Sequence, residues 1–514
     1  MASIRVFSGA TVGLEAYPIE VELDATAGLH FFSIVGLPDK TVDESKDRIG
    51  SALRNSGFVS PKQKNQRIIV NLAPADIKKA GAGFDLPIAM GYLLVSKQLK
   101  FDPKGRLFLG ELSLDGSVRR LNGILPIVTM AKAKGYKEIY LPKENVGEAS
   151  IIHGIAIYGI SSLTELVAHI KGAAVLQPTP PLSYSDYLAR SEAATSFAMS
   201  HIKGQENAKR ALVIAASGGH NILMHGPPGS GKTLLAKALA GIMPAMTHPE
   251  AIEVTKIYSI AGLVQEAPII TDRPFRNPHH TTSAAAVVGG GTWPRPGEIS
   301  LAHRGVLFLD EFPEFPRNVI ESLRQPMENG EVIVSRAART LKFPARFMLV
   351  AAMNPCPCGN YGDSVRACIC SPFSIEKYQK KVSGPIMDRI DIQIQVPRET
   401  YEKLRSKESQ GLSPIAMRSM ISEARQRQEV RLATAKLTTN SEMGPKEIEQ
   451  FCTLQPDAEA IMKKAMQMHH LSGRGYHKIL KLARTIADLD SKDVIESNHI
   501  AEAISYRIQP TASQ

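Results

Sequence analysis

The chain has 514 residues, of which 43% are hydrophobic and 22% charged, and its formal net charge is +11 at pH 7. No apolar run approaches the roughly 18 residues of a membrane helix, the first residues lack a signal-peptide pattern, and the few cysteines do not make a disulfide framework. We therefore expect a cytoplasmic protein of about three domains. Its positive charge permits a polyanionic partner such as nucleic acid, although many cytosolic proteins are basic without one.

The first 172 residues alternate short strand-like and helix-like segments, which predicts an α+β domain with its own core. The expected elements are strands at 20–24, 67–72 and 138–141, helices at 43–54, 84–94 and 125–134, and a hairpin at 107–116. Five basic residues are expected to be exposed, either as a solvated surface or facing nucleic acid: Lys62, Lys64, Arg67, Lys78 and Lys79.

Four stretches of this region, 71–76, 81–87, 110–116 and 141–145, resemble the proteolytic domain of Lon, which has the fold of the second domain of ribosomal protein S5. Lon-type proteases use a serine activated by a lysine. By this resemblance the serine position falls near Ala82 or Gly83 and the lysine position on Leu125. Because neither nucleophile nor base is present, we expect a structural or DNA-facing module rather than a protease.

A Pro-rich linker at 173–197 leads to a nucleotide-binding pattern. A predicted strand at 221–224 and a predicted helix at 234–242 flank a match to the phosphate loop G-x-x-x-x-G-K-[ST]. The matching residues are Gly226, Pro227, Pro228, Gly229, Ser230, Gly231, Lys232 and Thr233. Such a loop directs backbone N–H groups and a helix N-terminus at phosphates. We expect Lys232 to contact the β- and γ-phosphates of ATP and Thr233 to hold Mg²⁺.

Two further strands are predicted to end in polar residues of an ATPase centre. The apolar run beginning at Val306 ends in Asp310 and Glu311. We expect Asp310 to hold Mg²⁺ and Glu311 to polarise the attacking water. The run beginning at Phe347 ends in Asn354, which suits a sensor that positions this water. A turn-forming Asn before Pro355 explains the local sequence equally well, but the order of motifs favours the sensor.

Residues 383–391 resemble the segment that carries the arginine finger in magnesium-chelatase motors and replicative MCM helicases. By that resemblance Arg389 stabilises the γ-phosphate bound by a neighbouring subunit, so the active form is a ring or helix of subunits. The alternative is an internal salt bridge with Asp388 or Asp391.

The C-terminal region predicts a helical lid. Arg474 stands at the start of an amphipathic helix at 478–489 and suits a second sensor that folds over the nucleotide. Arg484 is the alternative, although its position is more typical of lid packing or surface. Further helices are expected at 417–432, 457–469 and 499–508; the first is rich in Arg and contacts DNA or is simply solvated.

A hairpin is predicted at 331–343. In the MCM and magnesium-chelatase branch of AAA+ proteins, which this part of the chain resembles, a hairpin at this place lines the central channel. Basic residues at or near its tip are expected to bind DNA phosphates independently of the base sequence. The alternative is a hairpin turn that is only solvated. These basic residues are Arg336, Arg339 and Lys342. Between the ATPase motifs, Arg273 and Arg276 are expected on a loop directed at the pore. The adjacent His279 and His280 lack partners at metal-ligand spacing.

Four clustered cysteines, Cys356, Cys358, Cys368 and Cys370, form two close pairs separated by nine residues. Two close pairs fit a structural four-thiolate Zn²⁺ site that joins the sensor to the arginine finger. The alternative is a reduced loop with free thiols. Cys452 stands alone and is expected to be buried.

The whole motif set resembles the magnesium-chelatase-like AAA+ ATPases of the YifB/ComM family. The Lon-like region and the segments 276–280, 354–359 and 473–476 carry this resemblance. It implies an α/β P-loop AAA+ module with an α-helical lid, preceded by an α+β Lon-like domain. The implied domains are 1–172 (Lon-like), 173–197 (linker), 198–397 (ATPase core) and 398–514 (lid).

The resemblance further implies an ATP- and Mg²⁺-dependent hexameric DNA motor, a helicase that drives branch migration in homologous recombination during natural transformation. Two alternatives remain open: an ATPase subunit of magnesium chelatase, and a DNA-binding scaffold without motor activity. Composition and spacing alone indicate only an ATPase motor.

Overall fold

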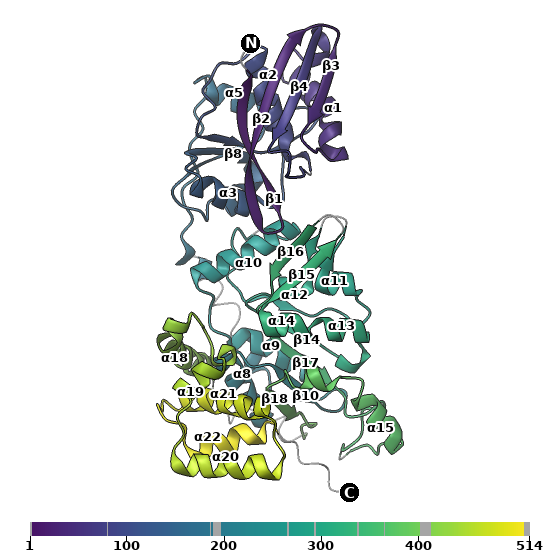
Figure 1. Cartoon of the computed structure of the whole chain (residues 1–514), viewed down its shortest axis with the longest axis vertical. Helices are drawn as coiled ribbons and strands as arrows, with labels where there is room; N and C mark the ends of the chain where they lie inside the picture. The colour runs from purple at the N-terminus through teal and green to yellow at the C-terminus, as the bar shows by residue number, and fades with distance from the viewer. Residues whose placement is uncertain are drawn as a thin grey trace. The chain divides into compact units, whose positions relative to one another are not determined.

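The computed structural model describes residues 3–507 except 80, 186, 189–196, 265–266, 292–293, 337–338, 364 and 401–412. The chain forms two compact units, one of residues 1–187 with 248–270 and one of residues 188–247 with 271–514 (Figure 1). The segment 248–270 follows the phosphate loop in sequence and was expected in the ATPase core. It packs instead with the N-terminal unit.

The first unit is built on a mixed sheet in the order β3-β4-β2-β1-β5-β8-β9. Its strands are β1 Ile4–Val12, β2 Glu15–Ala27, β3 Phe31–Val35, β4 Gln66–Ala73, β5 Arg106–Phe108, β8 Glu138–Pro142 and β9 Ala156–Ile160. Alternate residues of β2, Ile19, Val21 and Leu23, are fully buried, as expected for a strand with one face on a core. The main helices are α1 Lys40–Asn55, α2 Asp85–Val95, α3 Ile124–Ala133 and α5 Leu163–Ile170.

Three features of this unit differ from the sequence predictions. Strands β1, β3 and β9 were not predicted. The predicted hairpin is smaller and lies later, between β6 (Glu111–Leu112) and β7 (Val118–Arg119), because β5 joins the main sheet, where Leu107 pairs with Phe7. Lys79, expected on the surface, is fully buried, and its ammonium group donates to the carbonyl of Pro74.

Helix α10 (His248–Ala261) packs against α3 within this unit. The N–H of Gly123, just before α3, donates to the carbonyl of Ser259 at 3.0 Å. At the positions of the Lon dyad, Ala82 and Leu125 are buried, and the N–H of Leu125 donates to the Glu148 carboxylate at 3.0 Å. Apolar side chains and backbone pairing therefore occupy the place where the resemblance puts the protease chemistry.

The second unit contains a five-stranded parallel sheet in the order β11-β14-β17-β10-β18. Its strands are β11 Phe275–Arg276, β14 Val306–Leu309, β17 Met348–Met353, β10 Ile222–His225 and β18 Ile392–Gln395. All residues of β14 and β17 are buried, which explains their continuous apolar sequence. Helices α8 (Glu206–Gly218) and α9 (Lys232–Ile242) contribute to the same core.

The predicted hairpin is present as β15 (Glu331–Arg336) paired with β16 (Arg339–Pro344). The lid helices are α18 Pro414–Leu432, α19 Pro445–Phe451, α20 Pro456–Met468, α21 Gly473–Leu489 and α22 Ser497–Ser505.

The Arg-rich helix α18 uses two of its arginines to join the lid to the core. Arg418 donates to the carbonyl of Gly241 in α9 at 2.6 Å, and Arg425 donates to that of Ala216 in α8 at 2.7 Å. These two side chains therefore serve neither of the roles expected from sequence. In the part of the chain that the structure describes, no helix has the length and apolarity needed to cross a bilayer.

Candidate nucleotide-binding site

The phosphate loop connects β10 to α9. Gly229 and Gly231 adopt φ angles of +77° and +90°, which glycine accepts without steric cost. Helix α9 begins at Lys232, and no side chain caps its N-terminus. Its first N–H groups are therefore open to an anion, as phosphate binding requires.

Lys232 is buried beneath this loop. Its ammonium group donates to the carbonyls of Gly226 (2.8 Å) and Pro227 (3.0 Å) and to Oδ1 of Asn354 (3.3 Å). Burial lowers the pKa of Lys232, while Asp310 and Glu311 act in the opposite direction. The carbonyl contacts are ones that a bound phosphate can replace.

The candidate Mg²⁺ ligands lie together at the carboxyl ends of the strands. The Thr233 hydroxyl donates to Oδ2 of Asp310 at 2.7 Å, and the N–H of Glu311 donates to Oδ1 of the same carboxylate at 2.9 Å. Strands β14, β17 and β10 are neighbours in the sheet, so Asp310, Asn354 and the phosphate loop converge although they are far apart in sequence. A hydroxyl and a carboxylate beside a triphosphate are suitable ligands for Mg²⁺.

Two histidines near this centre had no role in the sequence interpretation. His225 ends β10, and burial, with a smaller effect of nearby Lys232, lowers its pKa to about 4. It is therefore neutral beside the phosphate loop. His280 lies with Nδ1 3.3 Å from Oε2 of Glu311. Sequence spacing gave no signal for this pair, because the two residues follow different strands.

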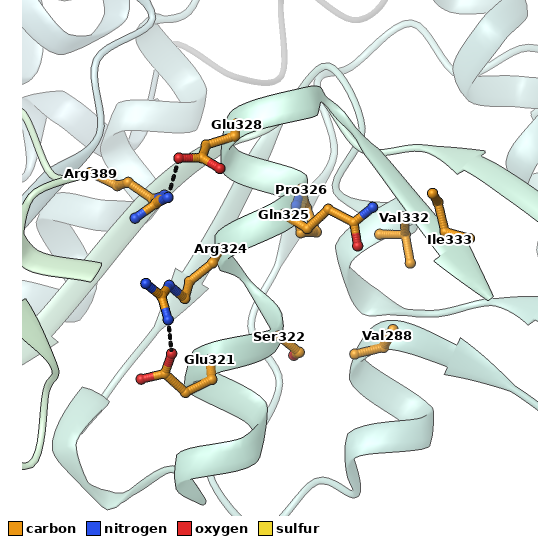
Figure 2. A pocket seen from close by; sticks show the side chains of 10 residues that line it. All are labelled: Val288, Glu321, Ser322, Arg324, Gln325, Pro326, Glu328, Val332, Ile333 and Arg389. Atoms are coloured by element: carbon orange, nitrogen blue, oxygen red, sulfur yellow. Dashed lines mark hydrogen bonds and ion pairs between the residues drawn. The ribbon is translucent and has the colours of Figure 1, made fainter. Parts of the chain in front are cut away.

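Arg389 lies at the edge of a pocket of about 480 Å³ between α14 (Arg324–Asn329) and β15. Figure 2 shows its guanidinium group facing Glu328 of α14, with which it forms an ion pair. It also donates to the carbonyl of Pro385 at 2.6 Å. An internal ion pair was the alternative expected from sequence, but its acid is Glu328 rather than Asp388 or Asp391.

The two arginines of α21 occupy different environments. Arg474 is exposed in the first turn of the helix, and in the described residues no hydrogen bond or ion pair joins it to the phosphate loop. Arg484 is buried, pairs with Asp488 and donates to the carbonyls of Lys492 and Asp493. Arg484 is thus a lid-packing residue, as its helix position indicated.

The lid is also tied to the base of the nucleotide-binding strand. Asp391 lies before β18, 3.0 Å from Nζ of Lys478 in α21 and 3.6 Å from Nδ1 of His220. Its carboxylate accepts from the N–H of Asn221, just before β10. These partners outweigh its burial and hold the pKa of Asp391 well below its usual range. A charged network therefore joins α21 to the strand that leads into the phosphate loop.

The four clustered cysteines fit a tetrahedral zinc ion. Their Sγ atoms all lie within 4.8 Å of one another, and the closest pairs are 3.4 and 3.6 Å apart. Four sulfurs at ~2.3 Å from a tetrahedral ion would be about 3.8 Å apart. N–H groups of Tyr361 and Cys370 donate to Cys356 and Cys368 at 3.3 and 3.4 Å. The N–H groups of Asn360 and Ile369 lower the pKa of Cys358 to about 6. Burial and the neighbouring cysteines raise the pKa values of Cys368 and Cys370, despite the backbone N–H that each accepts.

The cysteine loop contacts the phosphate loop. Gly359 has a φ of +80°, and a β-carbon placed on it would lie 2.6 Å from Cδ of Pro228. A zinc ion held by the cysteines would therefore fix a segment that packs directly against the nucleotide-binding loop. Cys452 is buried in the lid, as expected, and burial raises the pKa of its thiol to about 12.

The candidate DNA-binding side chains are only partly described. The backbones of Arg336 and Arg339 form the last pair of the hairpin ladder, but their side chains lie outside the described part of the structure. Lys342 is exposed and lies 2.9 Å from Glu331 across the hairpin. Of the two arginines predicted on a pore-directed loop, Arg276 forms a two-bond ion pair with Glu298 and Arg273 donates to backbone carbonyls. Their orientation toward a pore stays a prediction.

Three family descriptions match the chain: subunit ChlI of Mg-chelatase at 21–145, magnesium chelatase subunit ChlI at 198–404, and magnesium chelatase subunit ChlI C-terminal at 412–507. Competence protein ComM of Haemophilus influenzae is 42% identical over 509 residues, which is 99% of this chain and 98% of that protein. YifB of Escherichia coli is 40% identical over 504 residues, which is 98% of this chain and 96% of that protein. The chain belongs to the YifB/ComM family.

Similarity to magnesium chelatase itself is narrower. The 38 kDa magnesium-chelatase subunit of Cereibacter sphaeroides is 28% identical over 176 residues, which is 31% of this chain and 53% of that protein. YifB/ComM proteins thus share the ChlI-type ATPase module with chelatase subunits, while their match to this chain extends over nearly its full length. The family assignment and the α/β fold predicted from sequence are both confirmed.

Proposed function

We propose that this YifB/ComM protein is an ATP-driven DNA motor that works as a ring of subunits and moves branched DNA during recombination in natural transformation. The observation that carries the proposal is the convergence of Lys232, Thr233, Asp310 and Asn354 at one edge of the sheet. Full-length similarity to a protein named for competence supports DNA as the substrate.

In the proposed reaction the phosphate loop binds the triphosphate and Lys232 moves from loop carbonyls to its β- and γ-oxygens. Mg²⁺, held by Thr233 and Asp310, would neutralise charge on these oxygens. Glu311 polarises the attacking water, and Asn354 positions it. Asp310, Glu311 and Asn354 follow buried strands, and Lys232 and Thr233 begin helix α9, so regular elements fix the backbone positions of the site.

Completion of the site requires a second copy of the chain. Arg389 faces Glu328 and Pro385 of its own chain, and no described contact takes it to its own phosphate loop. An arginine from a neighbouring subunit would supply the missing positive charge at the γ-phosphate. We infer that the active form is a closed oligomer, with a hexamer as the family expectation. Arg474 would close over the nucleotide when the lid moves.

The DNA contact is assigned to the β15–β16 hairpin. Its basic residues would bind the phosphate backbone, so affinity should depend on salt and little on sequence. The decisive experiment measures ATP turnover with single-stranded, double-stranded and forked DNA, and then ATP-dependent resolution of a synthetic four-way junction.

The hairpin variant Arg336→Ala/Arg339→Ala should keep basal turnover and lose both stimulation and junction movement. A wild-type protein that hydrolyses ATP but never moves a junction would rule out branch migration. Stimulation by a porphyrin-binding partner instead of DNA would favour a magnesium chelatase subunit, the class to which part of the ATPase module is similar.

A further inference from the structure

The cysteine loop carries an apolar tip that the described part of its own chain leaves uncovered. The tip consists of Val365, Ile369 and Phe373, whose exposed fractions are 72%, 88% and 74%. Scattered apolar side chains are normal on a protein surface, whereas a local concentration of them indicates an interaction site. All three residues belong to one short stretch, 365–373, so the tip is such a concentration.

The cysteines hold this tip in place beside the phosphate loop. The N–H of Ile369 donates to the sulfur of Cys358, so its backbone is tied inward while its side chain faces solvent. Gly359, the residue after Cys358, packs against Pro228 of the phosphate loop. The apolar tip is therefore anchored next to the loop that binds the nucleotide.

A pocket that suits an apolar tip lies beside Arg389 in the same unit. Its volume of about 480 Å³ falls within the roughly 300–1,000 Å³ of clefts that bury a ligand. Figure 2 shows Val288, Val332 and Ile333 on one side of this pocket and Arg389 with Glu328 on the other. We call it the Arg389 pocket. Its apolar side can accept apolar side chains, and its charged side carries the candidate arginine finger.

Action of Arg389 between subunits would bring the apolar tip and the Arg389 pocket together. When Arg389 of one subunit reaches the phosphate loop of the next, the Arg389 pocket moves with it toward the cysteine loop that packs on that phosphate loop. Each subunit then offers its tip to one neighbour and its pocket to the other. Two different surfaces that meet head to tail are the arrangement from which closed rings are built.

We propose that the apolar tip of each subunit inserts into the Arg389 pocket of its neighbour, so that a second copy of this chain occupies both surfaces. The proposal rests on the proposed function, in which Arg389 acts between subunits. Insertion removes apolar side chains from water and aligns Arg389 with the phosphate loop that it completes. The cysteine cluster thereby supports ring assembly.

The test uses two variants that change opposite sides of this contact. Ile369→Asp places a charge on the tip and Val288→Asp places one in the pocket, and neither residue belongs to the hydrophobic core. Each variant alone should keep the wild-type melting temperature and weaken subunit association about thirtyfold or more, the effect of losing a hot spot. Sedimentation with Mg²⁺ and a non-hydrolysable ATP analogue measures the assembly. Leu29→Asp, at an exposed apolar residue of the first unit, is the matched control and should form rings as the wild type does.

An equimolar mixture of the two variants tests whether the tip and the pocket contact each other. The unchanged tip of a Val288→Asp chain fits the unchanged pocket of an Ile369→Asp chain, but the other tip and the other pocket of that pair each carry an Asp. The mixture should therefore form heterodimers that do not grow into rings. It should also regain part of the ATP hydrolysis, because Arg389 of the Ile369→Asp chain reaches the phosphate loop of the Val288→Asp chain.

Wild-type assembly of Ile369→Asp or of Val288→Asp would overturn the proposal, and so would a mixture that stays monomeric. A wild-type protein that forms no ring with nucleotide would overturn both this contact and the proposed ring. A wild-type protein that forms rings but moves no DNA junction would refute the DNA-motor function alone. Assembly of the two variants and their mixture would then still decide whether the tip binds the pocket.

Discussion

Replacement of Gly359 by Ala should weaken ATP binding through the cysteine loop. A β-carbon at this position would lie 2.6 Å from Cδ and 2.8 Å from Cγ of Pro228, whereas ordinary contacts begin near 3.4 Å. The two loops must therefore separate by about 0.8 Å, the difference between 3.4 and 2.6 Å. Overpacking of this kind costs about 1–3 kcal/mol. If displacement of the phosphate loop absorbs that cost, the Kd for ATP rises roughly 5- to 150-fold.

Gly362→Ala provides the matched control in the same loop. Gly362 has a φ of +76°, close to the +80° of Gly359, but open space surrounds its missing β-carbon. Both variants therefore carry the same backbone strain of roughly 1–2 kcal/mol, and only Gly359→Ala carries the contact with Pro228. Titration with a fluorescent ATP analogue measures the two affinities. Equal affinities in the two variants would refute the idea that the cysteine loop supports the phosphate loop.

Three other predictions concern the nucleotide site and the metal. Lys232→Ala should abolish ATP binding, whereas Glu311→Gln should bind ATP and turn it over at least a hundredfold more slowly; wild-type turnover in Glu311→Gln would remove that residue from the mechanism. Arg389→Ala should retain ATP binding and lose most ATP hydrolysis. Mixing this variant with Lys232→Ala should restore part of the hydrolysis. Glu328→Gln, which removes the charge of the ion-pair partner, should not lower turnover. Absence of rescue in mixed rings shown to form would argue against a finger acting between subunits. Purified protein should contain about one zinc per chain, measured by elemental analysis. Cys368→Ser should lose the zinc and melt at a lower temperature. Wild-type protein that contains no zinc after preparation without chelator would contradict the site.

Local patterns in the sequence were sufficient to predict the hairpin and three of the five ATPase strands, β10, β14 and β17, but not β11 or β18. The phosphate loop is one continuous motif, and buried parallel strands read as continuous apolar runs, so Asp310 and Asn354 could be placed at strand ends. That these ends meet at the phosphate loop follows from the order of the strands in the sheet. The roles of Lys232, Asp310 and Asn354 in hydrolysis remain predictions.

Contacts between distant segments could not be predicted in the same way. The His280–Glu311 pair depends on β11 being next to β14, and β11 is only two residues long. The partner of Arg389 is 61 residues away on α14. Lys79 was assigned to the surface by its charge alone, although burial of its long side chain was decided by tertiary packing. Charge and local spacing do not specify such contacts.

The assignment of residues 248–270 to the first unit affects how the protein can be dissected. The chain crosses between the two units after residues 187, 247 and 270. A protease cut in the Pro-rich stretch at 178–181 would leave residues 248–270 joined to the second unit at both ends, so the N-terminal fragment would be retained only by its noncovalent packing with that segment. A truncation that begins at residue 198 would keep α10 while removing α3, against which it packs, and would expose apolar surface of α10. A motor without its N-terminal unit must therefore also lack residues 248–270, with a flexible linker joining Thr247 to Thr271.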